Sequence, residues 1–292
     1  MDRRYLLRGV VPALGATCCF AGMAGLVKMA ATEAPSQVLV FLRALFGLLI
    51  VTPFAMRRGA AFFRTTRLKL HMLRALVSVC ALSCFYFAVS RVGLAESILL
   101  NASSPLFIGV LAVFMLGERL DRTTALVLVL GFRGVFLILK PGTALFQMGA
   151  VAAALSGLFV AFAKIFIRKM ADTEPVLRTV FYFSAFSTLY CFVPLLWLWQ
   201  TPSAYSVHCM ILAAAFATIG QTLLTYAYTH NNAAHVAPFS YVTVVLGGAL
   251  GWLFWREVPS PSSVAGAALV IGGCIGMVLR PKRSDPWGEV PR

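Results

Sequence analysis

The chain has 292 residues, of which 60% are hydrophobic and only 12% are charged. This composition lies far outside the average of soluble domains and excludes an ordinary water-soluble protein. The net charge of +15 comes from short bursts of Lys and Arg between apolar segments, a pattern typical of membrane topology signals rather than of a nucleic-acid-binding surface.

Ten apolar segments are long enough, or nearly so, to cross a bilayer, which takes about 20 helical residues. In chain order they lie at residues 9–30, 37–57, 70–90, 94–116, 123–140, 147–168, 177–199, 208–230, 233–254 and 262–280. The first is longer than the core of a signal peptide, so we interpret it as a span. The sequence therefore predicts an all-α integral membrane protein with ten transmembrane helices.

A motif at the end of the first segment recurs at the end of the sixth. Residues 28–33 and 169–174 are identical at five of six positions. Further matches follow 139 residues apart, such as Ala88 with Ala227 and Glu118 with Glu257. These echoes predict two five-span repeats at 1–142 and 143–283, followed by a tail at 284–292. Because five is odd, the second repeat would be inverted in the membrane relative to the first.

The distribution of Lys and Arg predicts the orientation. With a cytoplasmic N-terminus, 18 basic residues fall on the cytoplasmic side and 4 on the other, which leaves three within spans. Basic residues are enriched in cytoplasmic loops, so we predict that both termini are cytoplasmic. Arg74 is counted with the cytoplasmic residues in this assignment.

Paired motifs in the two halves resemble a known family. Residues 111–118 and 250–257 each end in glutamate, and each is followed by a short loop and a glycine-bearing span that stops at Lys140-Pro141 or Arg280-Pro281. Residues 234–239 read Ala-His-Val-Ala-Pro-Phe. The pattern is similar to the drug/metabolite transporter superfamily, EamA type, over essentially the whole chain. The resemblance implies a ten-helix carrier that works by alternating access around a central cavity, with the fifth and tenth spans at the periphery.

Polar side chains at mid-span depth are the candidate substrate contacts, because such side chains usually face the interior or a water-filled cavity. In the fourth span they precede Pro105, which predicts a broken or bent helix there. At the repeat offset, Asn101 and Ser104 correspond to Ser240 and Thr243. The alternative role is hydrogen bonding between helices. The predicted set is Arg43, Ser83, Tyr86, Asn101, Ser104, Gln221, Thr222, Thr225, Tyr226, Ser240, Tyr241 and Thr243.

The spans carry three basic residues and no mid-span acid, which argues against a membrane-embedded carboxylate relay. We expect Arg43 to reach the outer interface, to pair with Glu33, or to steer a substrate carboxylate. Lys164 is expected to extend toward the inner interface. Arg133 contacts backbone carbonyls, extends to the membrane surface, or holds a ligand carboxylate.

The sequence contains neither a catalytic constellation nor a metal-ligand spacing, and its seven cysteines lie in or beside spans. We therefore predict no enzyme activity, no cofactor and no metal. Together with the basic residues inside the spans, the family resemblance implies export of a small polar metabolite across the bacterial inner membrane, either amino-acid-derived or carboxylate-bearing, with opine-type metallophores among the candidates. The alternatives are uptake of S-adenosylmethionine or a similar metabolite, and a non-transporting intramembrane protein. The expected partners are the substrate and the lipid bilayer, with no nucleic acid, for a monomer or homodimer.

Overall fold

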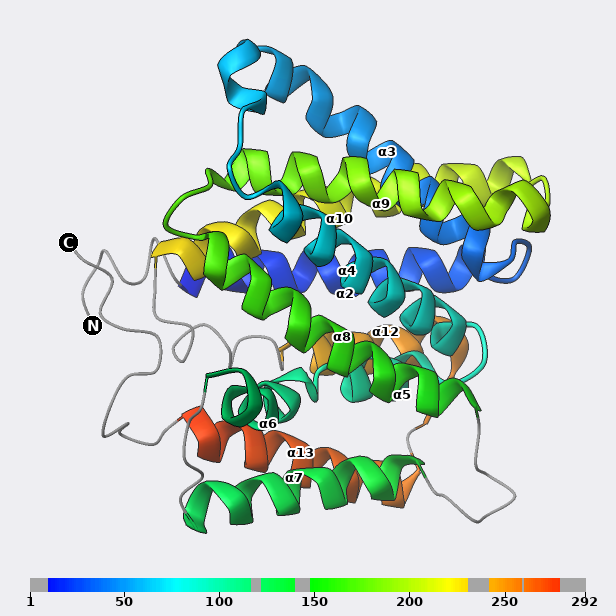
Figure 1. Ribbon diagram of the computed structural model, residues 1–292. Coiled ribbons are helices and arrows are strands. Elements are labelled where there is room, and N and C mark those ends of the chain that lie inside the picture. The colour runs from blue at the N-terminus through cyan, green and yellow to red at the C-terminus, as the bar shows by residue number, and fades with distance from the viewer. Residues whose placement is uncertain (1–9, 117–121, 140–147, 231–241, 259, 279–292) are drawn as a thin grey trace.

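The computed structural model describes residues 10–116, 122–139, 148–230, 242–258 and 260–278, and these are helices joined by short connections (Figure 1). The first half contains α2 (Val11–Ala30), α3 (Ser36–Met56), the 3₁₀ helix η2 (Ala60–Phe63), α4 (Leu68–Val89), α5 (Leu94–Asn101), α6 (Ser104–Leu116) and α7 (Arg122–Leu139). The second half contains α8 (Met148–Met170), α9 (Val176–Leu198), α10 (Ala204–His230), α12 (Val242–Trp255) and α13 (Pro261–Val278).

Among the described residues, six helices are long and apolar enough to cross a membrane: α2, α3, α4, α8, α9 and α10. Shorter apolar stretches lie in α5–α6, α7 and α12. The prediction of an all-α membrane protein is therefore confirmed. The count of ten spans and their inverted arrangement stay predictions.

Prolines set the start of the second long helix in each half. Pro35 precedes α3 and Pro175 precedes α9, each in an extended conformation. A proline disfavours helix at the residue before it, so the chain turns after α2 and after α8 and then starts a new helix. Both helices also contain an internal proline near the end, Pro53 in α3 and Pro194 in α9. The local signals are thus duplicated together with the motif that precedes them.

The helices pack in cross-half pairs. Helix α2 packs on α10, α4 on α8, α3 on α9, α5 on α12 and α7 on α13. Under the predicted repeat, in which α2 corresponds to α8, α3 to α9, α4 to α10 and α7 to α13, exchanging the halves converts the α2–α10 pair into the α8–α4 pair and leaves the α3–α9 and α7–α13 pairs unchanged. Figure 1 shows α7 and α13 side by side at the bottom of the view, away from α2 and α3.

The buried core contains mostly small and branched side chains from α2, α3, α4 and α10, such as Ala24, Val38, Ala213 and Ala217. Small residues allow helix backbones to approach closely in a membrane. Large apolar side chains such as Trp197 and Phe136 lie on the outside, where lipid would surround them. Because both faces of these helices are apolar, the core is distinguished by residue size rather than by polarity.

At each end of the bundle, loops between helices of the first half lie beside loops between helices of the second half. The α2–α3 and α9–α10 connections lie together at the right of Figure 1, whereas η2 and the α8–α9 connection lie at the left. We name these the Glu33 end and the Glu174 end, after the duplicated glutamates that they carry. The space between the two ends contains the candidate site.

Candidate functional site

A cavity of about 200 Å³ lies between the two halves. Its walls come from α2, α3, α4, α5 and α6 of the first half and from α8, α9, α10 and α12 of the second. Apolar side chains, including Phe20, Phe85 and Phe183, cover most of it. Its polar side chains are Thr17, Arg43, Arg74, Ser78, Asn101, Ser104, Lys164, Gln221 and Thr243. An apolar pocket with a few converging polar groups is the usual form of a small-molecule site.

The broken span forms one wall. Helix α5 ends at Asn101, the Ala102 N–H donates to the Ile98 carbonyl at 2.8 Å, and α6 begins at Ser104. Pro105 occupies the first turn of α6, where a missing N–H costs nothing. Gly157 of α8 packs against the break, since a Cβ there would lie 2.9 Å from the Leu100 carbonyl oxygen. The break predicted at Pro105 is therefore confirmed, and only glycine lets α8 approach it this closely.

Two polar pairs cross from this break to α8. Asn101 Nδ2 donates to Ser156 Oγ at 2.7 Å, and Lys164 Nζ donates to Ser104 Oγ at 2.8 Å. Both pairs join the halves, because Asn101 and Ser104 belong to the first half and Ser156 and Lys164 to the second. The wall thus combines amide, hydroxyl and ammonium groups at one level of the cavity.

Two arginines enter the cavity from neighbouring helices. Arg43 of α3 is 4% exposed and Arg74 of α4 is 1% exposed. Each guanidinium carbon lies over the ring of Phe183 in α9, at 5.6 Å for Arg43 and 4.8 Å for Arg74. Such distances allow cation–π attraction. The aromatic ring therefore holds two positive charges close together at the cavity wall.

The side chains that line the cavity include three cations and no Asp or Glu among the described residues. Gln221 of α10 contributes a side-chain oxygen that is buried without a hydrogen-bond partner. Burying a polar group without a partner is costly. A bound molecule could offset the positive charges with an acidic group, and it could donate a hydrogen bond from an N–H group to the Gln221 oxygen.

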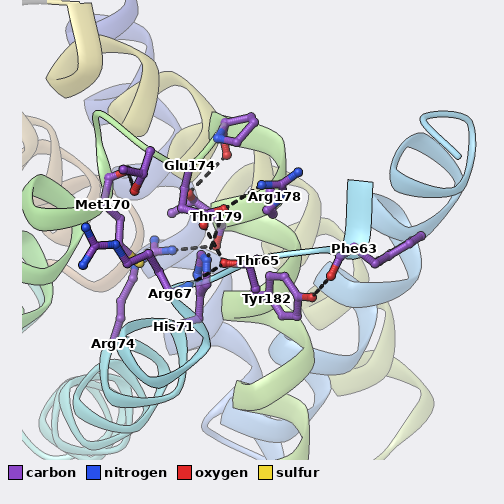
Figure 2. A network of polar contacts seen from close by, with 12 residues as sticks. Phe63, Thr65, Arg67, His71, Arg74, Met170, Glu174, Arg178, Thr179 and Tyr182 are labelled. Carbon is purple, nitrogen blue, oxygen red and sulfur yellow. Dashed lines mark hydrogen bonds and ion pairs between the residues drawn. The ribbon is translucent and has the colours of Figure 1, made fainter. Parts of the chain in front are cut away.

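The Glu174 end is closed by a network of charged and polar groups from both halves (Figure 2). We call Thr65, His71, Glu174, Arg178 and Tyr182 the Glu174 cluster. Thr65 Oγ1 donates to Glu174 Oε1 at 2.5 Å, and Arg178 Nη1 donates to Glu174 Oε2 at 3.0 Å. His71 Nε2 lies 3.6 Å from the same Oε2. The loop between η2 and α4, helix α4 itself and helix α9 thus each place one side chain against the same carboxylate.

Hydrogen bonds to backbone carbonyls also connect this end of the bundle to the segment around η2 and to the cavity wall. Arg178 Nε donates to the Phe62 carbonyl at 2.6 Å, and Tyr182 Oη donates to the Phe63 carbonyl at 2.6 Å. Arg74 Nη1 donates to the Thr179 carbonyl at 2.7 Å. Arg74 therefore belongs both to the cavity wall and to the contact between α4 and the first turn of α9.

The electrostatics at the Glu174 end favour the ionised carboxylate. Burial alone would raise the pKa of Glu174, but hydrogen bonds from Thr65 and Arg178, together with the charges of His71 and Arg178, lower it below its ordinary value. Hydrogen bonds to the charged form and nearby opposite charge both act in this direction. Glu174 is thus a charged centre of the closure.

The Glu33 end is closed by three separate contacts between the halves. Ser203 Oγ donates to Glu33, and Lys28 Nζ forms an ion pair with Glu257. Glu257 Oε2 also accepts from the Leu94 N–H at 2.7 Å, and Lys28 lies 5.2 Å from the Trp255 ring centre. The third contact joins Ser263 Oγ to Glu96 Oε1 at 2.5 Å.

The predicted site residues fall into three groups. Arg43, Asn101, Ser104, Gln221 and Thr243 line the cavity. Five others lie in the helices without lining it, and two lie outside the described residues. The five are Ser83, Tyr86, Thr222, Thr225 and Tyr226, and the two are Ser240 and Tyr241.

Among the five, Tyr86 is fully buried, and its hydroxyl lacks a partner among the described residues. Thr222 Oγ1 donates to the Thr218 carbonyl of its own helix at 2.8 Å. Thr225 is 2% exposed. Each of these three hydroxyls bonds within its own helix or has no partner among the described residues, so none of them shows the hydrogen bond between helices that the alternative role requires.

The structure changes the expected surroundings of Arg74 and Lys164, and it narrows the alternatives for Arg43 and Arg133. Arg74 is buried at the cavity wall rather than exposed in a cytoplasmic loop. Lys164 binds Ser104 in the cavity rather than extending toward the interface. Arg43 stacks on Phe183, whereas Glu33 binds Ser203. Arg133 of α7 is exposed and does not line the cavity, so it is not a central ligand contact.

Metal and thiol chemistry have no support in the described part of the chain. No group of three or more His, Cys, Asp or Glu side chains is placed to hold a metal ion there. The six cysteines in that part are free. The side chain of the seventh cysteine, Cys274, lies outside the described residues.

Comparison with known proteins agrees with this architecture. The EamA-like transporter family matches residues 7–140 and again residues 147–279. The chain is 31% identical to a pseudopaline exporter of Pseudomonas aeruginosa over 275 residues, which covers 93% of this chain and 96% of that protein. It is 24% identical to an S-adenosylmethionine uptake transporter of Rickettsia prowazekii over 257 residues, 88% of this chain and 87% of that one.

A known crystal structure aligns with a TM-score of 0.63 at 19% sequence identity, covering 92% of this chain and 96% of the other. At this identity the match shows the fold alone. The resemblance that the paired motifs indicated is confirmed by the family match over both halves. The chain belongs to the EamA-like transporter family, within the drug/metabolite transporter superfamily.

Proposed function

We propose that this protein exports a small, carboxylate-bearing metabolite derived from amino acids across the bacterial inner membrane by alternating access. The observation that carries the proposal is the cavity, which both halves share and whose lining includes Arg43 and Arg74 but no Asp or Glu among the described residues. A charge inside a membrane protein is costly and usually marks a substrate or ion path. Cations without acids favour an anionic or zwitterionic substrate over a bare cation.

The closures at the two ends support alternating access. Each end is held by contacts between the halves, the Glu174 cluster at one and the Ser203–Glu33 and Lys28–Glu257 contacts at the other. Opening one end while the other stays closed would expose the cavity to one side at a time. The basic-residue count assigns the Glu174 end to the cytoplasm. On that assignment substrate enters the cavity past Glu174 and leaves past Glu33.

Export is favoured over uptake by the relative that the chain matches at higher identity, the pseudopaline exporter. Comparing metabolites in the supernatants of a deletion strain, with and without the restored gene, tests the direction. An exporter adds acidic, amino-acid-derived compounds to the medium when the gene is restored. Depletion of such compounds from the medium would show uptake instead. An unchanged medium, with no saturable counterflow in liposomes, would indicate a protein that does not transport.

Two neighbouring residues of α10 test whether the cavity is the route. Gln221 lines it with an unpartnered oxygen, whereas Thr222 bonds to its own helix. Gln221→Leu should lower export of the identified compound about tenfold, as expected for one lost hydrogen bond to a substrate. Thr222→Val is the matched control and should export normally at equal protein level. Equal export by the two variants would place the route elsewhere.

A further inference from the structure

Arg43 and Arg74 carry two buried positive charges that no acidic side chain among the described residues neutralises. Both guanidiniums are buried over one ring, that of Phe183, and they are close enough to repel each other. Among the described residues, no ion pair involves either arginine. Two like charges buried together without an acid oppose folding unless another group offsets them.

The hydrogen bonds of the two arginines are incomplete as well. The Nε atom of each is buried without a partner among the described residues. Arg74 donates through Nη1 to the Thr179 carbonyl, which accepts a bond but supplies no negative charge. The ring of Phe183 offsets the positive charges only partly, since cation–π attraction is weaker than an ion pair at close range.

We infer that Arg43 and Arg74 together bind one carboxylate of the transported molecule, with Phe183 as the floor of the site. A carboxylate accepts hydrogen bonds on two oxygens, and a guanidinium presents donors in a matching planar fork. The inference rests on the proposed function and narrows it, because it assigns the acidic group of the substrate to one position. Arg74 is a substrate contact in this site, where the sequence pattern had placed a cytoplasmic loop residue.

The site also touches the closure at the Glu174 end. The bond from Arg74 to the Thr179 carbonyl ties the carboxylate site to the first turn of α9, which carries Arg178 of the Glu174 cluster. A carboxylate that draws Arg74 toward the cavity pulls on that turn. Occupancy of the site and closure of the Glu174 end are therefore linked through one side chain.

The test is ligand-induced thermal stabilisation of the purified full-length protein in detergent. Succinate and glutarate are the carboxylate probes, and succinamide and glutaramide, which carry no carboxylate, are their amide counterparts of nearly equal shape. We expect the carboxylates to raise the melting temperature in a saturable way and the amides to have little effect. Equal stabilisation by acid and amide, or none by either acid, would overturn the carboxylate site.

Arg74→Lys and Arg43→Lys then locate the binding. Lysine keeps the positive charge, and at position 74 it can still donate to the Thr179 carbonyl, so folding should be retained. Lysine cannot reproduce the planar fork of donors that a guanidinium presents to a carboxylate. The affinity for the carboxylate probes should therefore fall about tenfold or more in each variant. Arg133→Lys, an exposed arginine exchanged in the same way, is the control and should bind like the wild type.

Failure of this site and failure of the proposed function are separable. If Arg74→Lys binds the carboxylates as well as the wild type does, Arg74 is a structural link to α9 and the inferred site is wrong, whatever the export assay shows. If the carboxylates bind as expected but restoring the gene changes no metabolite in the medium, the site stands and the exporter assignment fails.

Discussion

The two ends of the bundle use the same contact in different surroundings. At the Glu174 end a threonine hydroxyl of the first half donates to a glutamate of the second, and at the Glu33 end a serine hydroxyl of the second half donates to a glutamate of the first. Glu33 and Glu174 are 141 residues apart, and Thr65 and Ser203 are 138 apart. The same kind of contact thus occurs at positions that the predicted repeat relates, and it joins the halves at both ends.

The neighbours of the two glutamates differ. Glu174 is buried and contacts Arg178 and His71, while Glu33 is exposed. At the repeat offset, the positions of Arg178 and His71 are occupied by Gln37 and Met210. Where Tyr182 bonds to a backbone carbonyl, the matching residue is a phenylalanine, Phe41. One copy of the contact has gained ionised partners, and we expect it to hold the halves together more firmly.

The largest expected difference comes from neutralising each glutamate. Glu174→Gln leaves the Arg178 guanidinium without its buried counter-charge, and removing one partner of a buried pair typically costs about 3–5 kcal/mol. Because Arg178 remains partly exposed, we expect a loss of about 2–3 kcal/mol. Glu33→Gln, at the duplicated but exposed position, should change stability by less than about 0.5 kcal/mol. Thermal unfolding in detergent measures both, and equal losses would contradict the difference between the ends.

Acid should weaken the Glu174 end selectively. The folded-state pKa of Glu174 lies below its ordinary value of 4.5, so its contribution to stability is complete above that value. The contribution is lost as the pH falls through the lowered pKa. The melting temperature of the wild type should therefore converge on that of Glu174→Gln as the solution is acidified below the ordinary value. The Glu33→Gln variant should keep following the wild type throughout, and a wild-type advantage over Glu174→Gln that persists in acid would contradict the assignment.

Much of this fold is predictable from the sequence because its signals are local. Apolar length indicates the spans, Pro35 and Pro175 indicate where α3 and α9 start, and Pro105 indicates the break after α5. The predicted start of the eighth span at residue 208 was late, since α10 begins at Ala204. Its first turn carries Tyr205, Ser206 and His208, whose polarity made it look like a connection.

The site is harder to predict, because the face that a membrane helix turns inward is weakly encoded when both faces are apolar. Mid-span depth and the repeat offset together selected Asn101 and Gln221, which line the cavity, and equally selected Tyr86 and Thr225, which do not. Arg74 was assigned to the cytoplasm because it lies near the start of its span. Burial by α9, which reaches it through the Thr179 carbonyl, is a tertiary effect that no local pattern indicates.

The smallest expected difference in stability between the two ends comes from removing the two hydroxyls. This pair of variants tests the comparison most directly, because each accepting glutamate stays intact. Thr65→Val removes a donor from an ionised, buried carboxylate, and we expect a loss of about 1–2 kcal/mol since bonds to charged groups are the stronger ones. Ser203→Gly removes the matching donor from an exposed carboxylate that water can solvate instead. Ser203 also caps α10, where its Oγ accepts from the Ser206 N–H at 3.1 Å, but glycine replaces serine at such a position at a cost of only a few tenths of a kcal/mol, so the expected loss is below about 0.5 kcal/mol. Melting curves at neutral pH would resolve the two. A loss of the same size from both hydroxyls would mean that the duplicated bond itself, and not the ionised neighbours of Glu174, sets the strength of each closure.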